Sequence, residues 1–188
     1  SIIKYFQASY SDIKDATEVY INLLYKFIDL DELEVVITCF QLLTKLLCYD
    51  KPFIQEKLLR SQNYFQWIAK FIGINRYWTN VIWLLQELIS KDELCIDSLL
   101  DSQVLENLLW LIEKNKNVNT KIKAIELLYT ILQCNNYRVF THLFENNILE
   151  IIIELLYSKE ASLIKVTLKV LESIFEYESN INVANFDS

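Results

Sequence analysis

Apolar residues recur along this chain with the spacing of amphipathic helices. Four segments carry apolar side chains at positions i, i+4, i+5 and often i+8, so that these side chains share one broad face of a helix. The segments are VYINLLYKFI from Val19, NYFQWIAKFI from Asn63, VLENLLWLIE from Val104 and ILEIIIELLY from Ile148. The pattern predicts four related helices that each bury one side.

A second helical segment follows each member of the first family. These segments are VVITCFQLLTKLL from Val35, NVIWLLQELI from Asn80, IKAIELLYTILQ from Ile122 and VTLKVLESIF from Val166. The apolar pairs that close them begin at Leu46, Leu88, Ile131 and Ile174, in steps of 42, 43 and 43 residues. Steps of this size fall within the roughly 40–47 residues of armadillo and HEAT repeats. The spacing therefore predicts an internal repeat.

A shorter helical segment connects consecutive pairs. It reads KPFIQEKLLRS from Lys51, ELCIDSLLDS from Glu93 and YRVFTHLFENN from Tyr137. Asp92 can cap one of these helices, because a carboxylate accepts hydrogen bonds from the free amides of the first turn. Each short helix leads into a turn of Ser61-Gln62-Asn63, Asp101-Ser102 or Asn146-Asn147. Asn and Asp tolerate a left-handed turn where Gly would otherwise be expected.

Three helices per unit are typical of armadillo repeats, whereas HEAT units usually have two. We therefore predict an all-α protein, a right-handed α-solenoid of about four armadillo units that form a single domain over residues 1–188. The expected units are 12–50, 51–92, 93–136 and 137–178, followed by an irregular tail at 179–188. A single unit cannot cover its apolar face, so neighbouring units bury each other's faces. Because the sequence begins at Ser1 and contains no Met, we expect it to be part of a longer array.

Composition excludes several alternatives. The 188 residues include one Gly and one Pro, far fewer than the turns of a β-sandwich or a βαβ protein need. The net charge of −7 argues against nucleic-acid binding, which needs a basic face, and favours the attraction of basic partners. No apolar run is long enough to span a membrane. We expect neither a membrane nor a cofactor among the ligands.

The four cysteines and the single histidine suggest no catalytic or metal site. Cys39, Cys48, Cys95 and Cys134 are too widely spaced for a zinc motif. They are interpreted as reduced thiols of an intracellular protein. His142 has no carboxylate or cysteine near it in the sequence pattern, which favours a structural role. Gly-rich phosphate loops, a Ser nucleophile elbow and HExxH are all absent, so we predict that the chain is not an enzyme.

The repeat pattern resembles the importin-alpha family. SDIKDATEVYINLLYKFIDLDELEVVITCFQLLTKLL is similar in order and spacing to the middle repeats of that family, and NNILEIIIELLYSKEASLIKVTLKVLESIF is similar to its late repeats. The resemblance extends from about Ile2 to Glu178 and rests on helix spacing and apolar positions. It implies an adaptor in the cytoplasm and nucleus that recognises basic nuclear localisation signals and engages an importin-beta-type receptor through a separate segment.

In this family a ladder of Trp and Asn on the third helices holds the signal peptide. Indole faces take the aliphatic stems of Lys and Arg, and Asn amides fix the peptide backbone. The Trp-equivalent positions here hold Gln41, Trp83, Glu126 and Lys169. The Asn-equivalent positions hold Lys45, Glu87, Thr130 and Ser173. Only Trp83 matches, so this sequence departs from the family at most of its peptide-binding positions.

The candidate groove residues are therefore Trp83, Glu87, Gln41, Lys45, Glu126 and Thr130. Trp83 and Glu87 are one helical turn apart and can hold one basic side chain between an indole face and a carboxylate. An amphipathic Trp packed against a neighbouring helix is the structural alternative. Lys45 and Lys169 oppose a continuous basic-peptide site and favour an acidic or phosphorylated ligand, unless they are ordinary solvated lysines.

Two functional alternatives remain beside the import adaptor. One is an armadillo scaffold or regulatory subunit unrelated to transport, holding a chaperone, a phosphatase or a cytoskeletal partner. The other is a structural subunit of a larger assembly. Such a subunit would expose an apolar patch on the convex side or at one end of the array.

Overall fold

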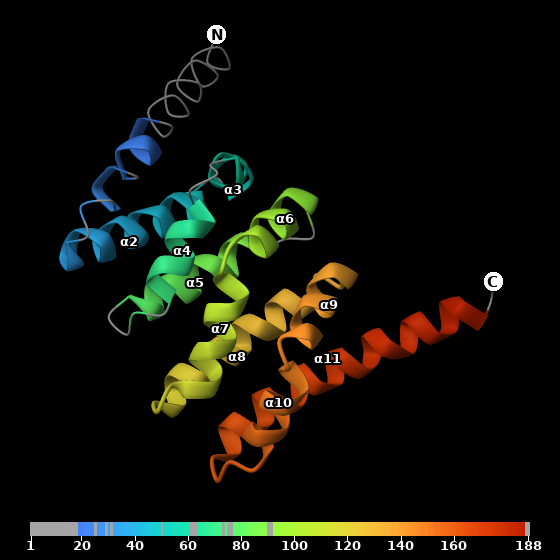
Figure 1. Cartoon of the computed structure of the whole chain (residues 1–188). Coiled ribbons are helices and arrows are strands. Elements are labelled where there is room, and N and C mark those ends of the chain that lie inside the picture. Colours follow the sequence, from blue (N-terminus) through green and yellow to red (C-terminus); the bar gives the residue numbers. More distant parts are fainter. Residues whose placement is uncertain are drawn as a thin grey trace. The chain divides into compact units, whose positions relative to one another are not determined.

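Helices account for every regular element in the described part of the chain. The computed structural model describes residues 19–24, 26–28, 30, 32–49, 51–60, 64–72, 74, 77–89 and 92–186. It confirms the predicted all-α fold, and each predicted helical segment contains a helix (Figure 1). The first residues of the predicted unit 12–50 lie outside the described residues. Two compact units, Ser1–Ser61 and Gln62–Ser188, divide the chain within the second predicted repeat, and each is described by itself.

The first unit is built on α2, which packs against α3. α2 spans Leu33–Tyr49 and α3 spans Lys51–Leu59. Residues 19–24 and 26–28 are helical and belong to the same unit. Apolar side chains at helical spacing are buried on all three helices: Ile21, Leu24, Ile28, Val36, Phe40, Leu43, Leu47, Ile54 and Leu58. Burial of these side chains is the main term that stabilises the unit.

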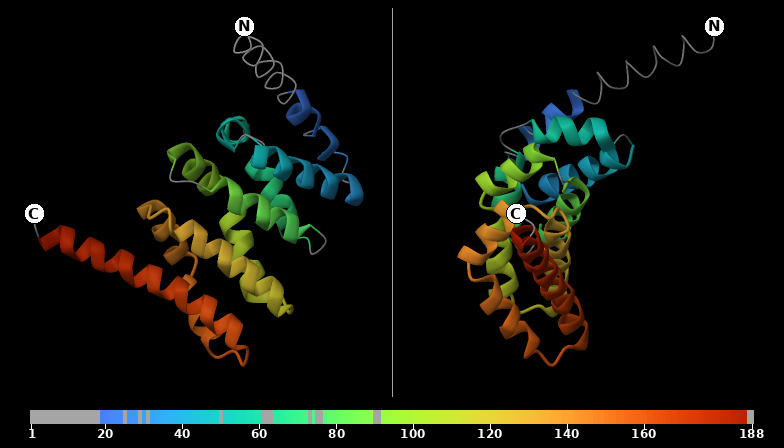
Figure 2. Two further views of the ribbon diagram at one scale, coloured as in Figure 1. Left: turned by 180° about the vertical axis from the view of Figure 1, so that it is seen from behind. Right: turned by 90° about the vertical axis from the view of Figure 1, so that its right-hand side faces the viewer.

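The second unit contains eight helices among its described residues. They are α4 (Tyr64–Ile72), α5 (Trp78–Leu88), α6 (Glu93–Asp101), α7 (Val104–Lys114), α8 (Val118–Leu132), α9 (Tyr137–Glu145), α10 (Ile148–Leu156) and α11 (Ala161–Phe186). Their packing repeats every third helix. α4 contacts α7, which contacts α10; α5 contacts α8, which contacts α11; and α6 contacts α9 (Figures 1 and 2).

Polar contacts between these helices follow the same period. The Asn107 amide on α7 donates to the Ala69 carbonyl on α4 at 2.9 Å, across 38 residues. Gln133, directly after α8, donates to the Ser173 hydroxyl on α11 at 3.0 Å, across 40 residues. These separations lie close to the sequence step of 42–43 residues. The repeat seen in the apolar pattern is thus also the repeat of the long-range contacts.

Side chains at the helix ends explain where several helices begin. The carboxylate of Asp92 accepts a hydrogen bond from the Leu94 amide at 2.8 Å, which confirms the predicted cap of α6. Asn147 adopts a left-handed conformation with φ of 59° before α10, as its position in the turn predicted. Ser102 has φ of −99°, so the turn before α7 is not left-handed there. The turn at 61–63 lies outside the described residues.

The prediction of an irregular tail from residue 179 is wrong for most of that segment. α11 continues without interruption to Phe186. The amphipathic pattern ends near Glu178, but no Gly or Pro follows it. A helix does not require an apolar stripe to continue once it is nucleated, because each further residue adds a backbone hydrogen bond. Loss of periodicity therefore did not mark the end of the helix.

Candidate peptide-binding surface

Trp83 and Glu87 lie one turn apart on α5, on the side opposite the core. The neighbouring Ile82, Leu84 and Leu85 are buried, whereas 40% of Trp83 is exposed. Glu87 is half-buried. The exposure of Trp83 follows from its position in the helix, because the core-facing stripe of α5 is completed by other residues. A half-exposed indole beside a carboxylate can accept a cationic side chain with an aliphatic stem.

Glu126 and Thr130 lie on α8, the helix that packs against α5. The Glu126 carboxylate is paired with the Lys123 ammonium at 2.6 Å, and 37% of its side chain is exposed. The Thr130 hydroxyl donates to the Glu126 carbonyl at 3.0 Å. The charge of the Glu126 carboxylate is therefore partly neutralised by Lys123 of the same helix. The Thr130 hydroxyl already donates its hydrogen bond to the helix backbone.

Lys169 and Ser173 bring α11 into register with α8. The Lys169 ammonium lies 5.8 Å from the centre of the Tyr129 ring on α8, within the range of a cation–π contact. The Ser173 hydroxyl accepts from Gln133 and donates to the Lys169 carbonyl at 3.1 Å. At this position the protein's own lysine rests on an aromatic ring, as a lysine of a peptide would.

The structure thus brings four of the six candidate residues onto neighbouring helices. Trp83 and Glu87 on α5 and Glu126 and Thr130 on α8 belong to the surface that we name the α5–α8–α11 surface, together with Lys169 and Ser173. Gln41 and Lys45 lie on α2 in the unit Ser1–Ser61, and both are exposed. The candidate site is therefore defined by residues of the second unit alone.

Two residues of this surface, Tyr129 and Gln133, were missed by the sequence analysis. Each lies three residues after the position equivalent to its partner, since the contacts join positions 40 residues apart and the repeat step is 43. A shift of three residues is about one helical turn. Each contact therefore joins a residue of one repeat to the residue one turn beyond its counterpart in the adjacent repeat. The signal was present in the sequence as a half-exposed Tyr on α8 and an exposed Gln directly after it.

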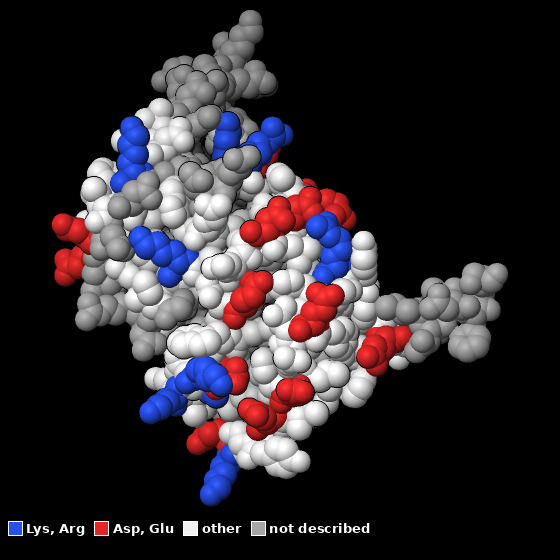
Figure 3. Space-filling view, viewed as in Figure 1, with Lys and Arg blue, Asp and Glu red and all other residues white. Residues whose placement is uncertain are grey.

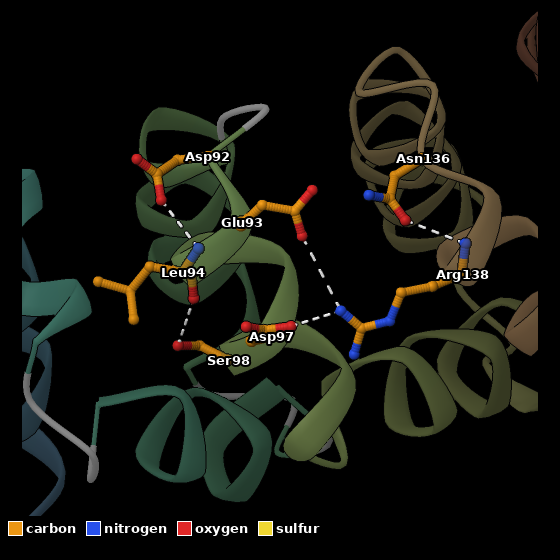
Figure 4. A network of polar contacts seen from close by, with 7 residues as sticks. All are labelled: Asp92, Glu93, Leu94, Asp97, Ser98, Asn136 and Arg138. Carbon is orange, nitrogen blue, oxygen red and sulfur yellow. Dashed lines mark hydrogen bonds and ion pairs between the residues drawn. The ribbon is translucent and has the colours of Figure 1, made fainter.

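A second group of polar contacts, which the sequence analysis also missed, joins α6 to α9. The Arg138 guanidinium donates to Asp97 and lies 3.9 Å from Glu93, while Asn136 caps α9 by accepting from the Arg138 amide (Figure 4). The hydrogen bond to Asp97, aided by nearby negative charge, raises the pKa of Arg138 above its ordinary value. The guanidinium therefore remains charged and ties consecutive short helices together.

His142 has a carboxylate beside it that the sequence spacing concealed. Its Nε2 lies 3.0 Å from Glu106 Oε1, and the pair joins α9 to α7. The expectation that no carboxylate accompanies this histidine was wrong, because packing brings distant helices together. A search of the described residues finds no group of three or more His, Cys, Asp and Glu side chains that could hold a metal ion.

The cysteines differ in their surroundings. Cys39 and Cys95 are buried, Cys134 is half-buried and Cys48 is exposed, and each carries a free thiol. Burial raises the pKa of the Cys39 thiol, which disfavours the reactive thiolate. Buried Cys39 thus acts as a small apolar side chain of the core of the first unit.

Acidic side chains dominate the visible face of the second unit. Figure 3 shows them spread over this part of the surface with few lysines or arginines between them. The net charge of the chain is −7. A field of this sign raises the encounter rate with cationic ligands and repels anionic ones. None of the helices in the described part of the chain is long and apolar enough to cross a membrane.

Comparison with known proteins adds a structural likeness only. No protein-family model matches the sequence, and no curated protein is significantly similar to it. The crystal structure of an engineered protein, a structural genomics target, is similar to this chain with a TM-score of 0.51 at 15% identity. The likeness covers 77% of this chain and 66% of the engineered one, so it spans slightly less than two thirds of that protein. It supports the helical fold and carries no information on function.

Proposed function

We propose that this chain is a protein-binding adaptor of stacked armadillo-type repeats, which binds an extended basic peptide on the α5–α8–α11 surface. The succession of α5, α8 and α11 is the observation that supports it most directly. These helices belong to one sequence family and pack one after another. Equivalent positions, Trp83, Glu126 and Lys169, therefore recur along one surface at the repeat spacing. An extended peptide can contact such positions in turn.

The basic character of the ligand is inferred from Trp83, Glu87 and Glu126. An exposed indole next to carboxylates suits a Lys or Arg side chain, whose stem covers the ring while its charge meets the acid. Lys169, already placed on Tyr129, opposes a basic side chain at α11. We therefore place the binding of the cation at α5 and α8. A cargo-binding role in the cytoplasm and nucleus, as in importin-alpha, is the form of this function that we favour.

The experiment is the titration of a fluorescently labelled bipartite basic peptide with the full chain, followed by anisotropy. We expect saturable binding with a Kd in the micromolar range or tighter, and weaker binding at physiological salt than at low salt. Glu87→Lys and Trp83→Ala should each weaken binding at least about tenfold, a change on the order of 1.4 kcal/mol. A peptide with its basic residues replaced by Ser serves as the ligand control.

Trp110→Ala is the matched control variant. Trp110 is 54% exposed but lies on α7, which belongs to the other helix family. Its removal should leave the affinity unchanged. Absence of saturable binding at either salt concentration by the folded chain would contradict the proposal. It would leave two alternatives, the non-transport scaffold, which holds a chaperone, a phosphatase or a cytoskeletal partner, and the structural subunit of a larger assembly.

A further inference from the structure

The contact between Lys169 and Tyr129 places a cation of the chain itself on the α5–α8–α11 surface. The Lys169 ammonium on α11 lies 5.8 Å from the centre of the Tyr129 ring on α8, and Tyr129 is half-exposed while Lys169 is exposed. An aromatic face attracts an ammonium at this distance through the electron density of the ring. The Tyr129 ring is therefore a cation site, and a side chain of the same protein occupies it.

The ring, and not a carboxylate, holds this lysine. In the described part of the chain no carboxylate forms an ion pair with Lys169. The neighbouring Lys123 is instead paired with the Glu126 carboxylate at 2.6 Å. A carboxylate accepts several hydrogen bonds, so Glu126 can still receive a cation of a ligand. A ring face that one ammonium covers is closed to a second.

The register of the repeat shows how the two steps of the surface differ. Lys169 and Tyr129 are 40 residues apart, as are the partners of the hydrogen bond between Gln133 and α11. Applied to α5 and α8, this register pairs Glu126 with Gln86. The step from α5 to α8 thus offers an acid and an amide, and the step from α8 to α11 offers a ring that already carries a cation. A basic peptide meets a counter-charge at the first step and a like charge at the second.

We propose that Lys169 is the specificity-determining residue that confines the binding of a basic peptide to α5 and α8. It covers the Tyr129 ring and repels a peptide cation from it, because like charges placed side by side oppose binding. The surface therefore reads one short basic cluster and excludes a cation one helix further on. This inference rests on the proposed function, since it states which positions of the same peptide are bound.

Helix spacing sets the interval at which the excluded cation lies. The axes of packed helices are about 8–10 Å apart, and an extended peptide advances by about 3.3 Å per residue. One step along the surface therefore corresponds to about three peptide residues. The basic residue that Lys169 excludes is about three positions from the one that Trp83 holds.

Titration of the labelled bipartite basic peptide with variants of the full chain, followed by anisotropy, tests the proposal. Lys169→Gln should raise the affinity at least about fivefold, because it removes a like charge and opens the Tyr129 ring. Lys169→Gln/Tyr129→Leu should lose this gain. Lys169→Gln/Tyr129→Phe should retain it, because phenylalanine keeps the aromatic face. Far-UV circular dichroism checks that each variant is folded.

Lys165→Gln is the matched control. Lys165 is exposed one helical turn before Lys169, so its replacement removes the same charge from the same helix. Its partner in the register is Ile125, which offers no aromatic ring. Lys165→Gln should therefore raise the affinity less than about twofold, through the general change in charge. Equal gains from the two substitutions would show that charge alone is responsible and would overturn the proposal.

Replacing the basic residues of the peptide by Ser, one at a time, locates the gain. One of these replacements should change the affinity of the unaltered chain by less than about twofold and weaken the binding of Lys169→Gln at least about fivefold. The residue concerned should lie about three positions from the one whose replacement weakens both proteins most. The same profile for both proteins would contradict the proposal.

The contact itself can be tested without a peptide, by NMR of the lysine side chains. In the free chain the Cε protons of Lys169 should resonate upfield of those of Lys165, because the ring current of Tyr129 acts on them. The difference should disappear in Tyr129→Leu, and its absence from the unaltered chain would overturn this inference alone.

The outcomes separate this inference from the proposed function. Binding by the unaltered chain that Trp83→Ala weakens, with no gain in Lys169→Gln, leaves the proposed function intact and overturns the role of Lys169. Absence of binding by both the unaltered chain and Lys169→Gln overturns both.

Discussion

At the scale of single residues, two turns in the described part of the chain use Asn where other proteins use Gly. Asn147 lies at φ 59° and ψ 33°, in the left-handed region directly before α10. Asn135, before α9, has φ of 54°. A side chain with a Cβ meets a carbonyl oxygen in this conformation, and the short polar chain of Asn is among the few that offset the strain locally. The sequence has one Gly in 188 residues, and asparagine takes the left-handed positions at these two described turns.

The left-handed backbone of Asn147 predicts different effects of alanine and glycine at this position on the free energy of unfolding. Asn147→Ala should lower the free energy of unfolding by about 1 kcal/mol, because alanine gains nothing in the left-handed region. Asn147→Gly should leave it unchanged or raise it by a few tenths of a kcal/mol. Urea denaturation followed by circular dichroism measures both. Lys165, exposed in the interior of α11, is the control, since Gly there should be destabilising by about 1 kcal/mol. Equal losses at 165 and 147 for Gly would show that the left-handed turn has no energetic role.

At the scale of elements, successive helices are joined by polar contacts as well as by apolar packing. Arg138 bridges α9 to Asp97 and Glu93 of α6, one repeat earlier. Ser173 and Asn107 make comparable links in the two other helix families. Apolar packing supplies most of the stability, but it tolerates sliding of one helix along another. Directional hydrogen bonds fix the register.

Arg138 and Asp97 should show a coupling that depends on salt. In a double-mutant cycle with Arg138→Met and Asp97→Asn, we expect a favourable interaction free energy at low ionic strength. This interaction free energy should diminish in about 1 M salt. The Debye length there is about 3 Å, and both groups are partly exposed, so that salt screens their attraction. Thermal and urea unfolding at both salt concentrations provide the values. The Arg60–Glu56 pair within one turn of α3 is the control, and its coupling should be no larger. An Arg138–Asp97 coupling that salt does not alter would contradict this account.

The elements themselves could be predicted from the sequence to a large extent. All three families of helical segments were predicted by apolar spacing, and so were the cap at Asp92 and the left-handed Asn147. The end of α11 was predicted wrongly, because a helix can continue without an apolar stripe, and α11 extends to Phe186. The sequence pattern also gave no means of pairing His142 with Glu106, since only the tertiary structure brings these two residues of α9 and α7 together.

At the scale of the whole molecule, the second unit has a packed interior and an open face. Equivalent residues of successive repeats differ in burial according to whether a further helix packs on them. Leu105 on α7 is fully buried, and its counterpart Leu149 on α10 is 39% exposed. Truncation of the same type of side chain should therefore lower the free energy of unfolding by different amounts in different repeats.

Leu105→Ala and Leu149→Ala test this dependence with one chemical change at two equivalent positions. Leu105→Ala should lower the free energy of unfolding by about 2–5 kcal/mol, because it leaves a cavity in a packed interior. Leu149→Ala should cost less than about 1 kcal/mol, because much of that side chain is already in water. Chemical denaturation followed by circular dichroism gives both values. Equal losses would mean that the assigned register is wrong.

The sequence by itself determined the helices, their three families and their spacing, because these depend on local hydrogen bonding and on the periodicity of apolar side chains. It also placed Trp83 and Glu87 one turn apart, since helix geometry alone sets that distance. Tertiary structure decided which residues meet across helices, among them Lys169 with Tyr129 and Arg138 with Asp97. It also decided which apolar residues stay open, Phe175 among them. The physical reason is that burial requires contact between two surfaces, and the sequence of one segment specifies only one of them.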